Sequence, residues 1–440
     1  MIDIKLIREK PEEVKKMLQK RYSNFPINKL IEKDTQWRQL KKTLEEKKHE
    51  KNKVSEQIAK TKPNQLIKQT QDEENQKFSK PEQFEKLAQE LKKEIKQLEE
   101  KINKEKQELD KLILACPAML DKTVPEGKTE KDNPVIRIIG EPKKYSFELK
   151  NHAELIEQLN IGNFEKAAQT SGRGFNYLFN DLALLDLALQ KFAIDFLMKK
   201  GHSLITPPLM LNKKIYEGVV DLTDFENVMY KIQDEENYLI ATAEHPLIAL
   251  FENEVLDEEQ LPLKLVGLSP AFRKEIGAHG VDTRGLFRMH QFNKVEQIII
   301  CKPEDSKKAL EELHTNAEEL YKKLEIPFRT IEICAGDLSI KNAKQYDIEA
   351  WFPRQQEYKE VGSSSNCVDF QSRALNIKFG KRGGAKEFVH TLNATGIATS
   401  RALVAILENN QNEKGEIEIP KLLIPYMNGK TKINTNKKIL

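Results

Sequence analysis

Apolar residues recur every three or four positions in two stretches near the start of the chain, residues 28–60 and 82–114. The recurring residues are Leu30, Trp37, Leu40, Leu44, Val54 and Ile58, and then Ala88, Leu91, Ile95, Leu98, Ile102, Leu109 and Leu112. This spacing is typical of two helices that share a buried seam. The polar stretch 61–81 contains Pro63 and Pro81 and should reverse the chain. The pattern predicts an antiparallel coiled-coil hairpin with helices of about 30 residues, or about 45 Å.

A short amphipathic helix is expected within residues 1–26, and a polar connector with one strand near Val135–Ile139 follows the hairpin. Beyond residue 150 the pattern becomes mixed. The apolar stretch 181–200 predicts a helix, as does 397–410. Strands are expected near residues 203–206, 237–242, 263–268, 286–300, 328–334 and 388–393. The body should therefore be an α+β domain built on a large antiparallel or mixed sheet with flanking helices.

Charge and glycine divide the chain at the same place as the hydrophobic pattern. The net charge is only +3, but residues 1–116 hold 29 Lys and Arg against 22 Asp and Glu, a net of +7. The remainder holds 43 against 47, a net of −4, and it contains all 19 glycines. A basic helix pair is compatible with nucleic-acid binding, but also with a solvated face or a protein-binding coiled coil.

Several classes of protein are unlikely on composition. No run of about 18 apolar residues predicts a membrane span, and the start MIDIKLIREK lacks the apolar core of a signal peptide. The four cysteines, Cys116, Cys301, Cys334 and Cys367, form no CxxC pair. A disulfide framework or zinc ribbon is therefore not expected, and a reducing cytoplasm fits.

The segment 268–300 is the most informative for chemistry, because it reads as strand, polar loop and strand. On a strand, Arg273 and Glu275 would face the same side. Arg can neutralise a phosphate and Glu can accept from an exocyclic amine, so the pair could serve a nucleotide. A structural ion pair on a hairpin explains it equally well.

Three further segments carry candidate residues. In 390–411 a strand with Asn393 and Thr395 leads into an apolar helix bearing Arg401, which needs an anionic partner such as a triphosphate or a buried carboxylate. Thr242 and Glu244 share a face if their segment is extended. Glu360 and Ser363 could hold Mg²⁺ through hard oxygens. Alone, either of the last two pairs is also explained by a surface loop.

Taken together, these residues resemble a known family. Phe272-Arg273-Lys274-Glu275 with the following loop and Arg288 resembles motif 2 of class II aminoacyl-tRNA synthetases, and Gly396 with Arg401 resembles motif 3. The helix at 181–200 followed by ITPPL resembles motif 1. Residues 242–244, 282–296, 363–373 and 390–396, together with the hairpin, are similar to seryl-tRNA synthetases in particular. The resemblance covers essentially the whole chain.

The resemblance implies a class II antiparallel sheet core flanked by helices (residues 117–440), preceded by a tRNA-binding arm (residues 1–116). Its implied activity is ATP-dependent activation of L-serine to seryl-adenylate. Transfer of serine to the 3′ end of tRNA(Ser), and of selenocysteine tRNA where present, would follow. It also implies a cytoplasmic homodimer without a membrane segment.

The resemblance also assigns site residues. For serine these are Thr242, Ala243, Glu244, Arg273, Glu296, Asn393 and Thr395. For ATP they are Arg273, Lys274, Glu275, Arg288, Glu360, Val361, Gly362, Ser363 and Arg401, with Glu360 and Ser363 also framing Mg²⁺. Glu244 would take the α-ammonium of serine and Glu296 its hydroxyl. Arg273 would contact the α-phosphate, Glu275 the adenine amine and Arg401 the γ-phosphate.

Three positions depart from the family pattern: Val281 and Ala374 stand where Arg is common, and Thr395 stands where Ser is common. A paralogue that charges a carrier protein would be expected to lack the hairpin. A catalytically dead homologue would be expected to lack Arg273, Glu275 or Arg401, and all three are present. A zinc-dependent form is disfavoured by the dispersed cysteines. Another class II specificity, such as threonyl, prolyl or histidyl, is disfavoured by resemblance alone.

Overall fold

The computed structural model describes residues 1–65, 80–220, 228–275, 285–381 and 383–439. These group into two compact units. The smaller unit comprises Ile4–Pro11 and Asn24–Cys116. The larger comprises Met1–Asp3, Glu12–Ser23 and Pro117–Leu440.

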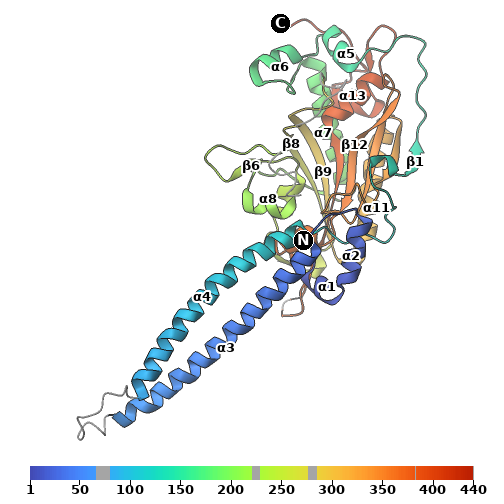
Figure 1. Cartoon of the computed structure of the whole chain (residues 1–440). Helices are drawn as coiled ribbons and strands as arrows, with labels where there is room; N and C mark the ends of the chain where they lie inside the picture. The colour runs from blue at the N-terminus through green and yellow to red at the C-terminus, as the bar shows by residue number, and fades with distance from the viewer. Residues whose placement is uncertain (66–79, 221–227, 276–284, 382, 440) are drawn as a thin grey trace. The chain divides into compact units, whose positions relative to one another are not determined.

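The smaller unit is dominated by two long helices, α3 (Ile27–Gln65) and α4 (Lys80–Ala115), which lie side by side (Figure 1). Their shared seam is apolar. Its buried members are Leu30, Leu44, Val54, Leu91, Ile95, Ile102, Leu109 and Ile113. The predicted hairpin is therefore present, and each helix is longer than the expected 30 residues.

The polar residues that interrupt the seam pair across it. Lys33 Nζ lies 2.8 Å from Glu105 Oε2 and Lys47 Nζ lies 3.0 Å from Glu94 Oε2. A third bridge joins Lys48 to Glu99 at 3.0 Å. Lys33 near the start of α3 pairs with Glu105 near the end of α4, and the later Lys47 pairs with the earlier Glu94, as an antiparallel arrangement requires. Such bridges fix the register of the two helices more than they stabilise them.

The chain start differs from the single short helix predicted over residues 1–26. It forms two helices, α1 (Ile4–Glu9) and α2 (Pro11–Lys20). Pro11 is the reason, because proline has no backbone N–H and is accepted at the first position of a helix but not inside one.

The larger unit is built on one eight-stranded sheet (Figure 1). All neighbouring strands are antiparallel except the last pair, β8 and β4, which is parallel. In sheet order the strands are β1 (Val135–Ile139), β10 (Phe328–Glu332), β11 (Lys344–Phe352), β12 (Glu357–Asn366), β15 (His390–Ala398), β9 (Gln291–Cys301), β8 (Leu263–Phe272) and β4 (Ser203–Ile205).

Each predicted strand region contains a strand, with two differences. The strand predicted over 286–300 begins only at Gln291. The region 237–242 gives β6 (Asn237–Leu239), which pairs with β5 (Met210–Asn212) outside the large sheet. The predicted α+β class with a mostly antiparallel sheet is confirmed.

Helices cover both faces of the sheet, and β9 shows how. Val295 and Ile299 pack with α7 (Asn180–Lys199), α11 (Ser306–Lys323) and α13 (Thr399–Asn409). Ile298 and Ile300 instead pack with α8 (Lys213–Val219) and α10 (Glu244–Ala249). Because side chains alternate along a strand, Lys294 and Glu296 share the second face. That face carries the candidate site.

The helices predicted over 181–200 and 397–410 correspond to α7 and α13. None of the helices in the described ranges is both long and apolar enough to cross a membrane. The remaining α-helices and strands of the described residues are α5 (His152–Gln158), α6 (Phe164–Ser171), α12 (Phe370–Ala374), β2 (Gly162–Asn163), β3 (Tyr177–Leu178), β7 (Val255–Leu256), β13 (Lys378–Phe379), β14 (Glu387–Phe388), β16 (Ile417–Glu418) and β17 (Lys432–Ile433).

Candidate active site

Two adjoining cavities lie over three neighbouring strands, β12, β15 and β9. The first, of about 280 Å³, is lined mainly by polar side chains. They are Thr242, Glu244, His245, Arg273, Lys294, Ser339, Lys341, Asn342, Gln345, Ser363, Ser365 and Asn393. This cavity, which we call the amino-acid cavity, is of a size and polarity suited to a small polar ligand.

Glu244 is the buried anion of the amino-acid cavity, and it begins α10. Its Oε1 accepts hydrogen bonds from Lys341 Nζ and from Gln371 Nε2, both at 2.8 Å. Burial alone would raise the pKa of Glu244, but the Lys341 ammonium lowers it to about 2. The carboxylate is therefore held charged and in one orientation.

Glu296 lies on β9 beside this cavity and behaves differently. It is 1% exposed, and its Oε2 forms an ion pair with Lys294 Nζ at 2.6 Å. Burial raises the pKa of Glu296, and Lys294 offsets this only in part. The site thus contains two buried carboxyls whose pKa values shift in opposite directions, which is typical of functional sites.

The second cavity, of about 90 Å³, is lined by cations and aromatic rings as well as by β12. Its residues are Arg273, Glu275, Phe287, Met289, Phe292, Lys294, Glu360, Val361, Gly362, Ser363, Thr395, Ala398, Ser400 and Arg401. We call it the nucleotide-side cavity. Arg273, Lys294 and Ser363 line both cavities, so the two spaces meet at two cations and a hydroxyl.

Arg401 enters the nucleotide-side cavity from the first turn of α13. Its guanidinium lies 3.2 Å from Glu360 Oε2 and donates to the Glu360 carbonyl at 2.8 Å. The guanidinium also lies 5.2 Å from the centre of the Phe287 ring. The anionic partner expected for Arg401 is therefore the carboxylate of Glu360. It is not buried, however, because its side chain is 49% exposed at the cavity rim.

A β-bulge explains how Glu360 and Ser363 reach the same cavity. Residues three apart on a regular strand face opposite sides. Here Gly362 pairs with Ile348 and Glu360 with Glu349, which leaves Val361 as an extra residue on β12. The bulge shifts the alternation by one residue, so both oxygen-bearing side chains line one space.

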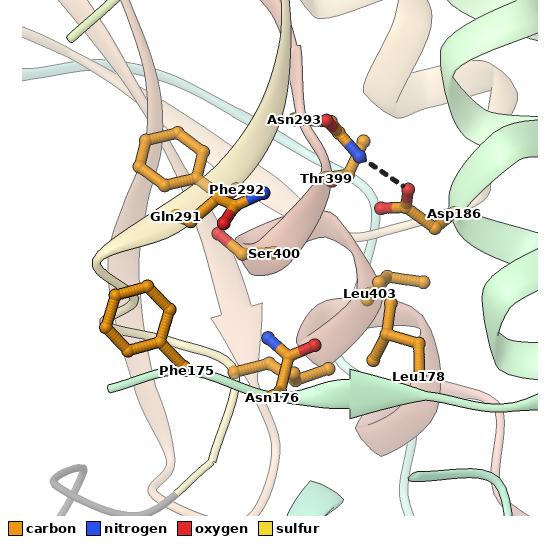
Figure 2. Close-up of a pocket in the computed structure, with 11 residues that line it drawn as sticks. Phe175, Asn176, Leu178, Asp186, Gln291, Phe292, Asn293, Thr399, Ser400 and Leu403 are labelled. Atoms are coloured by element: carbon orange, nitrogen blue, oxygen red, sulfur yellow. Dashed lines mark hydrogen bonds between the residues drawn. The ribbon is translucent and has the colours of Figure 1, made fainter. Parts of the chain in front are cut away.

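A third cavity, of about 140 Å³, lies between β9 and the helices α7 and α13 (Figure 2). Asp186 of α7 points at Asn293, whose Nδ2 donates to it at 2.8 Å, and Gln190 donates at 2.6 Å. Burial raises the pKa of Asp186. Phe292 and Ser400 line this cavity and the nucleotide-side cavity alike, so Asp186 supports the back of the site.

Most of the predicted site residues come together. Those lining a cavity are Thr242, Glu244, Arg273, Glu275, Glu360, Val361, Gly362, Ser363, Asn393, Thr395 and Arg401. Thr395 lines the nucleotide-side cavity rather than the amino-acid cavity. The residues outside both linings are Ala243, which is in the core, Lys274, Arg288 and Glu296. Arg288 pairs with Glu275 at 3.6 Å.

Two local expectations are wrong, although their residues still line the site. Arg273 and Glu275 do not face one side of a strand, because β8 ends at Phe272 and Glu275 has a left-handed φ of 47°. Thr242 and Glu244 are not extended, because α10 begins at Glu244. The Glu244 N–H donates to Thr242 Oγ1 at 3.2 Å, which closes a turn.

Sequence reasoning missed Phe292, Lys294, Met289 and Lys341. The alternation that places Glu296 on the active face of β9 also places Lys294 and Phe292 there, so those two could have been found. Lys341 precedes β11 in a loop and has no such signal. Val281, like the other residues of the motif 2 loop from 276 to 284, and most of the stretch 61–81 lie outside the described residues.

Family models match both parts of the chain. Residues 229–410 match the tRNA synthetase class II core domain (G, H, P, S and T). Residues 1–120 match the seryl-tRNA synthetase N-terminal domain.

Relatives match over the whole length. The serine–tRNA ligase of Methanocorpusculum labreanum is 46% identical over 434 residues, which is 98% of this chain and 99% of that protein. The crystal structure of seryl-tRNA synthetase from Pyrococcus horikoshii complexed with ATP has a TM-score of 0.90 at 42% identity, covering 99% of this chain and 100% of that chain. The cytoplasmic serine–tRNA ligase of Naegleria fowleri in complex with AMP has a TM-score of 0.87 at 34% identity, covering 99% of both chains. The chain therefore belongs to the seryl-tRNA synthetases, a family with the class II synthetase core.

Proposed function

We propose that the chain activates L-serine with ATP to seryl-adenylate, releases pyrophosphate and transfers the seryl group to the 3′ end of tRNA(Ser). Where a selenocysteine tRNA is present, it would be charged as well. The observation that carries the proposal is the junction of two cavities at Arg273, Lys294 and Ser363. An amino-acid carboxylate and an α-phosphate would meet there between two cations. The relatives bound to ATP and AMP support the nucleotide assignment.

The serine-binding set is Thr242, Ala243, Glu244, Arg273, Glu296, Asn393 and Thr395. Glu244 is suited to the α-ammonium because its pKa, lowered to about 2, keeps it ionised. Glu296 would accept from the serine hydroxyl. A site built to pair a hydroxyl rejects alanine, because its own polar groups would be left unpaired. No general base is required, since the serine carboxylate is already the nucleophile.

The ATP-binding set is Arg273, Lys274, Glu275, Arg288, Glu360, Val361, Gly362, Ser363 and Arg401. Arg273 would neutralise the α-phosphate and Arg401 the γ-phosphate, while Glu275 would accept from the adenine amine. We add Phe292, whose ring lines the nucleotide-side cavity 5.4 Å from the Arg273 guanidinium and offers adenine a stacking face. Catalysis then depends on positioning and on neutralising charge at phosphorus.

Glu360 and Ser363 fit a Mg²⁺ ion, because the bulge at Val361 aims a carboxylate and a hydroxyl into one cavity. Within the described residues no cluster of three or more His, Cys, Asp or Glu could hold a metal. A Mg²⁺ held by one or two protein oxygens and completed by substrate phosphates matches that small donor set. When bound, the ion would supply positive charge to the triphosphate.

The arm, residues 1–116 with the coiled coil at about 28–60 and 82–114, would bind tRNA. Its net charge of +7 supports contacts to phosphates, which would make tRNA binding salt-dependent through counterion release. Residues 117–440 would form the catalytic domain. The match of residues 1–120 to the family's N-terminal domain model supports this division.

A homodimer is part of the proposal. Large apolar side chains are exposed along α7, β4 and β5, where a class II core would pair through motif 1. They are Leu187 at 60%, Met198 at 48%, Leu204 at 44%, Leu209 at 38% and Met210 at 47%. Exposed apolar surface of this kind supports an interaction site. A cytoplasmic location agrees with the four cysteines, all of which are buried and free.

Charging of tRNA transcripts tests the complete function. With ATP, the protein should attach serine to tRNA(Ser) and not to a tRNA of another specificity. Transfer of serine to a carrier protein instead, or no transfer at all, would contradict the proposal.

A further inference from the structure

His152 lies at the start of α5, away from both cavity linings, yet it connects two elements of the site. It is 3% exposed. Its Nδ1 lies 2.9 Å from Oε1 of Glu408, a fully buried residue of α13. Its Nε2 lies 3.1 Å from the backbone nitrogen of Leu286.

These contacts define the tautomer of the ring. A backbone N–H can only donate, so Nε2 of His152 must accept from Leu286. The ring proton therefore sits on Nδ1 and is donated to the Glu408 carboxylate. A carboxylate in this place fixes both the tautomer and the orientation of an imidazole.

The backbone around Leu286 is shaped to receive the ring. Gly285 has a φ of 129°, and a Cβ at that residue would lie 2.0 Å from His152 Nε2. No other residue type could let the imidazole approach this closely. The ring of His152 thus lies against the backbone of Gly285 and Leu286, which directly follow residues 276–284 in the sequence.

Phe287, the residue after Leu286, connects this contact with the site. Its ring lines the nucleotide-side cavity, with the Arg401 guanidinium 5.2 Å and Lys359 Nζ 5.3 Å from its centre. Arg401 is on the same helix, α13, as Glu408. Glu408 and His152 therefore link the helix that bears Arg401 to the backbone that bears Phe287.

We propose that His152 is a positioning residue for the nucleotide side of the site, which acts by accepting the Leu286 N–H and so holds Phe287 against Arg401. It touches neither substrate. The inference rests on the proposed function in that it takes this cavity to be the ATP site. It predicts an effect on ATP that is not matched by one on serine.

Two variants separate this role from simple packing. In His152→Gln, the amide oxygen can reach the place of Nε2 and still accept from Leu286. In His152→Asn, the shorter amide can occupy the place of Nδ1 and bond Glu408, but cannot reach Leu286. If the residue merely anchored α5 to Glu408, Asn would be the better replacement.

The measurements are KM for ATP and for serine in pyrophosphate exchange, and the affinity for ATP alone by calorimetry. We expect His152→Asn to weaken ATP binding about tenfold, as for a lost hydrogen bond, and to leave KM for serine unchanged. His152→Gln should stay within about twofold of the parent protein for both substrates. His202→Asn is the matched control, because His202 is also 3% exposed but lines none of the three cavities. It should leave ATP affinity unchanged.

Parent-like ATP affinity in His152→Asn would overturn the inference, as would equal losses for ATP and serine or a larger loss in His152→Gln. Failure of the proposed function would look different. The parent protein would then bind ATP but show no serine-dependent exchange, and the calorimetric comparison of the two His152 variants would still decide the inference.

Discussion

Lys341 determines the charge state of Glu244, the carboxylate that lines the amino-acid cavity. Burial disfavours the charged form of Glu244, and the ammonium 2.8 Å away reverses that effect. Glu296 shows the other balance, since its pKa stays raised despite Lys294 at 2.6 Å. The two residues have the same side chain, so the opposite shifts of their pKa values come from their surroundings alone.

Replacing Lys341 by Met should destabilise the protein by about 3 kcal/mol at neutral pH, because Glu244 would keep a buried charge without its cation. In the parent protein the lowered pKa of Glu244 contributes stability above its unfolded value of 4.5, which is lost as pH falls toward 2. In the variant, burial would raise the pKa of Glu244, so the cost of burying its unpaired charge disappears as the carboxyl is protonated at lower pH. The difference in free energy of unfolding between parent and variant should therefore narrow from pH 7 toward pH 4.

Urea unfolding at several pH values measures this difference. Lys264→Met is the matched control, because Lys264 pairs at 2.6 Å with Glu312 but both side chains are more than a quarter exposed. The control should lose less than about 1 kcal/mol. An unfolding difference for Lys341→Met that is equally small, or that grows at low pH, would contradict the account of Glu244.

Arg401→Ala should reduce serine-dependent exchange by roughly a hundredfold, because the cation that we propose to neutralise the γ-phosphate is removed. The free energy of unfolding should fall by only about 1 kcal/mol or less, since the partner Glu360 is half exposed. Arg329→Ala is the control. Arg329 pairs with Glu349 outside both cavities and should leave exchange intact. Retained exchange in Arg401→Ala would show that Arg401 is only an ion-pair partner.

Site residues could be predicted from the sequence where the type of residue, or a second polar residue close by, suggested a chemical role. Arg401 was singled out because a charge is unusual in an apolar helix, whereas Arg273 and Glu360 were singled out together with a second polar residue, Glu275 and Ser363 respectively. Lys341 could not be found, because its role depends on a contact with Glu244, 97 residues away. Glu275 was found for a wrong geometric reason, since it lies beyond the end of β8.

At the scale of elements, helices with long apolar runs were predicted well and polar strands poorly. The segments 181–200 and 397–410 differ from α7 and α13 by no more than two residues at either end. Neither β11 nor β12 is among the strands expected above, and of β12 only Glu360 and Ser363 were singled out. Both carry charged residues such as Asp347 and Glu360, and burial inside a sheet comes from distant partners rather than from local pattern.

The bulge on β12 is another feature that no local pattern signals. Between two successive pairs with β11, the strand β12 contains one additional residue. Only the pairing of the two strands shows that this residue is Val361. The sequence suggested Glu360 and Ser363 as a pair, although their spacing on a regular strand argued against it.

The exposed apolar face along α7, β4 and β5 predicts a dimer that a single charge can break. Leu187→Lys places an ammonium at a side chain that is 60% exposed, so the fold of one subunit should survive. We expect a shift from dimer to monomer in light scattering coupled to gel filtration. Leu250→Lys is the control, because Leu250, the residue directly after α10, is 59% exposed and its replacement should leave the dimer intact. A monomeric parent protein, or an unchanged Leu187→Lys dimer, would contradict this assignment.

At the scale of the whole molecule, the division into a basic helical arm and a mildly acidic body was visible in charge, glycine content and periodicity together. The reason is that a coiled coil needs a strict apolar period and excludes glycine, whereas a sheet with tight turns uses it. What could not be predicted is which polar groups of the arm pair across the seam, since no local pattern assigns Lys33 to Glu105 or Lys47 to Glu94.

Replacing residues 30–112 by a short flexible linker should separate the two proposed activities. Exchange should persist, because both cavities are lined only by residues of the larger unit. Charging of tRNA(Ser) should be lost or weakened by at least about a hundredfold, since the phosphate contacts of the arm would be gone. Undiminished charging by this variant, at equal salt, would mean that the arm does not bind the tRNA.

Pyrophosphate exchange into ATP, measured with each of the twenty amino acids in turn, tests the central claim most directly. The junction of the two cavities predicts exchange that depends on serine and exceeds the exchange with any other amino acid. No exchange with serine, or stronger exchange with a different amino acid, would contradict the account.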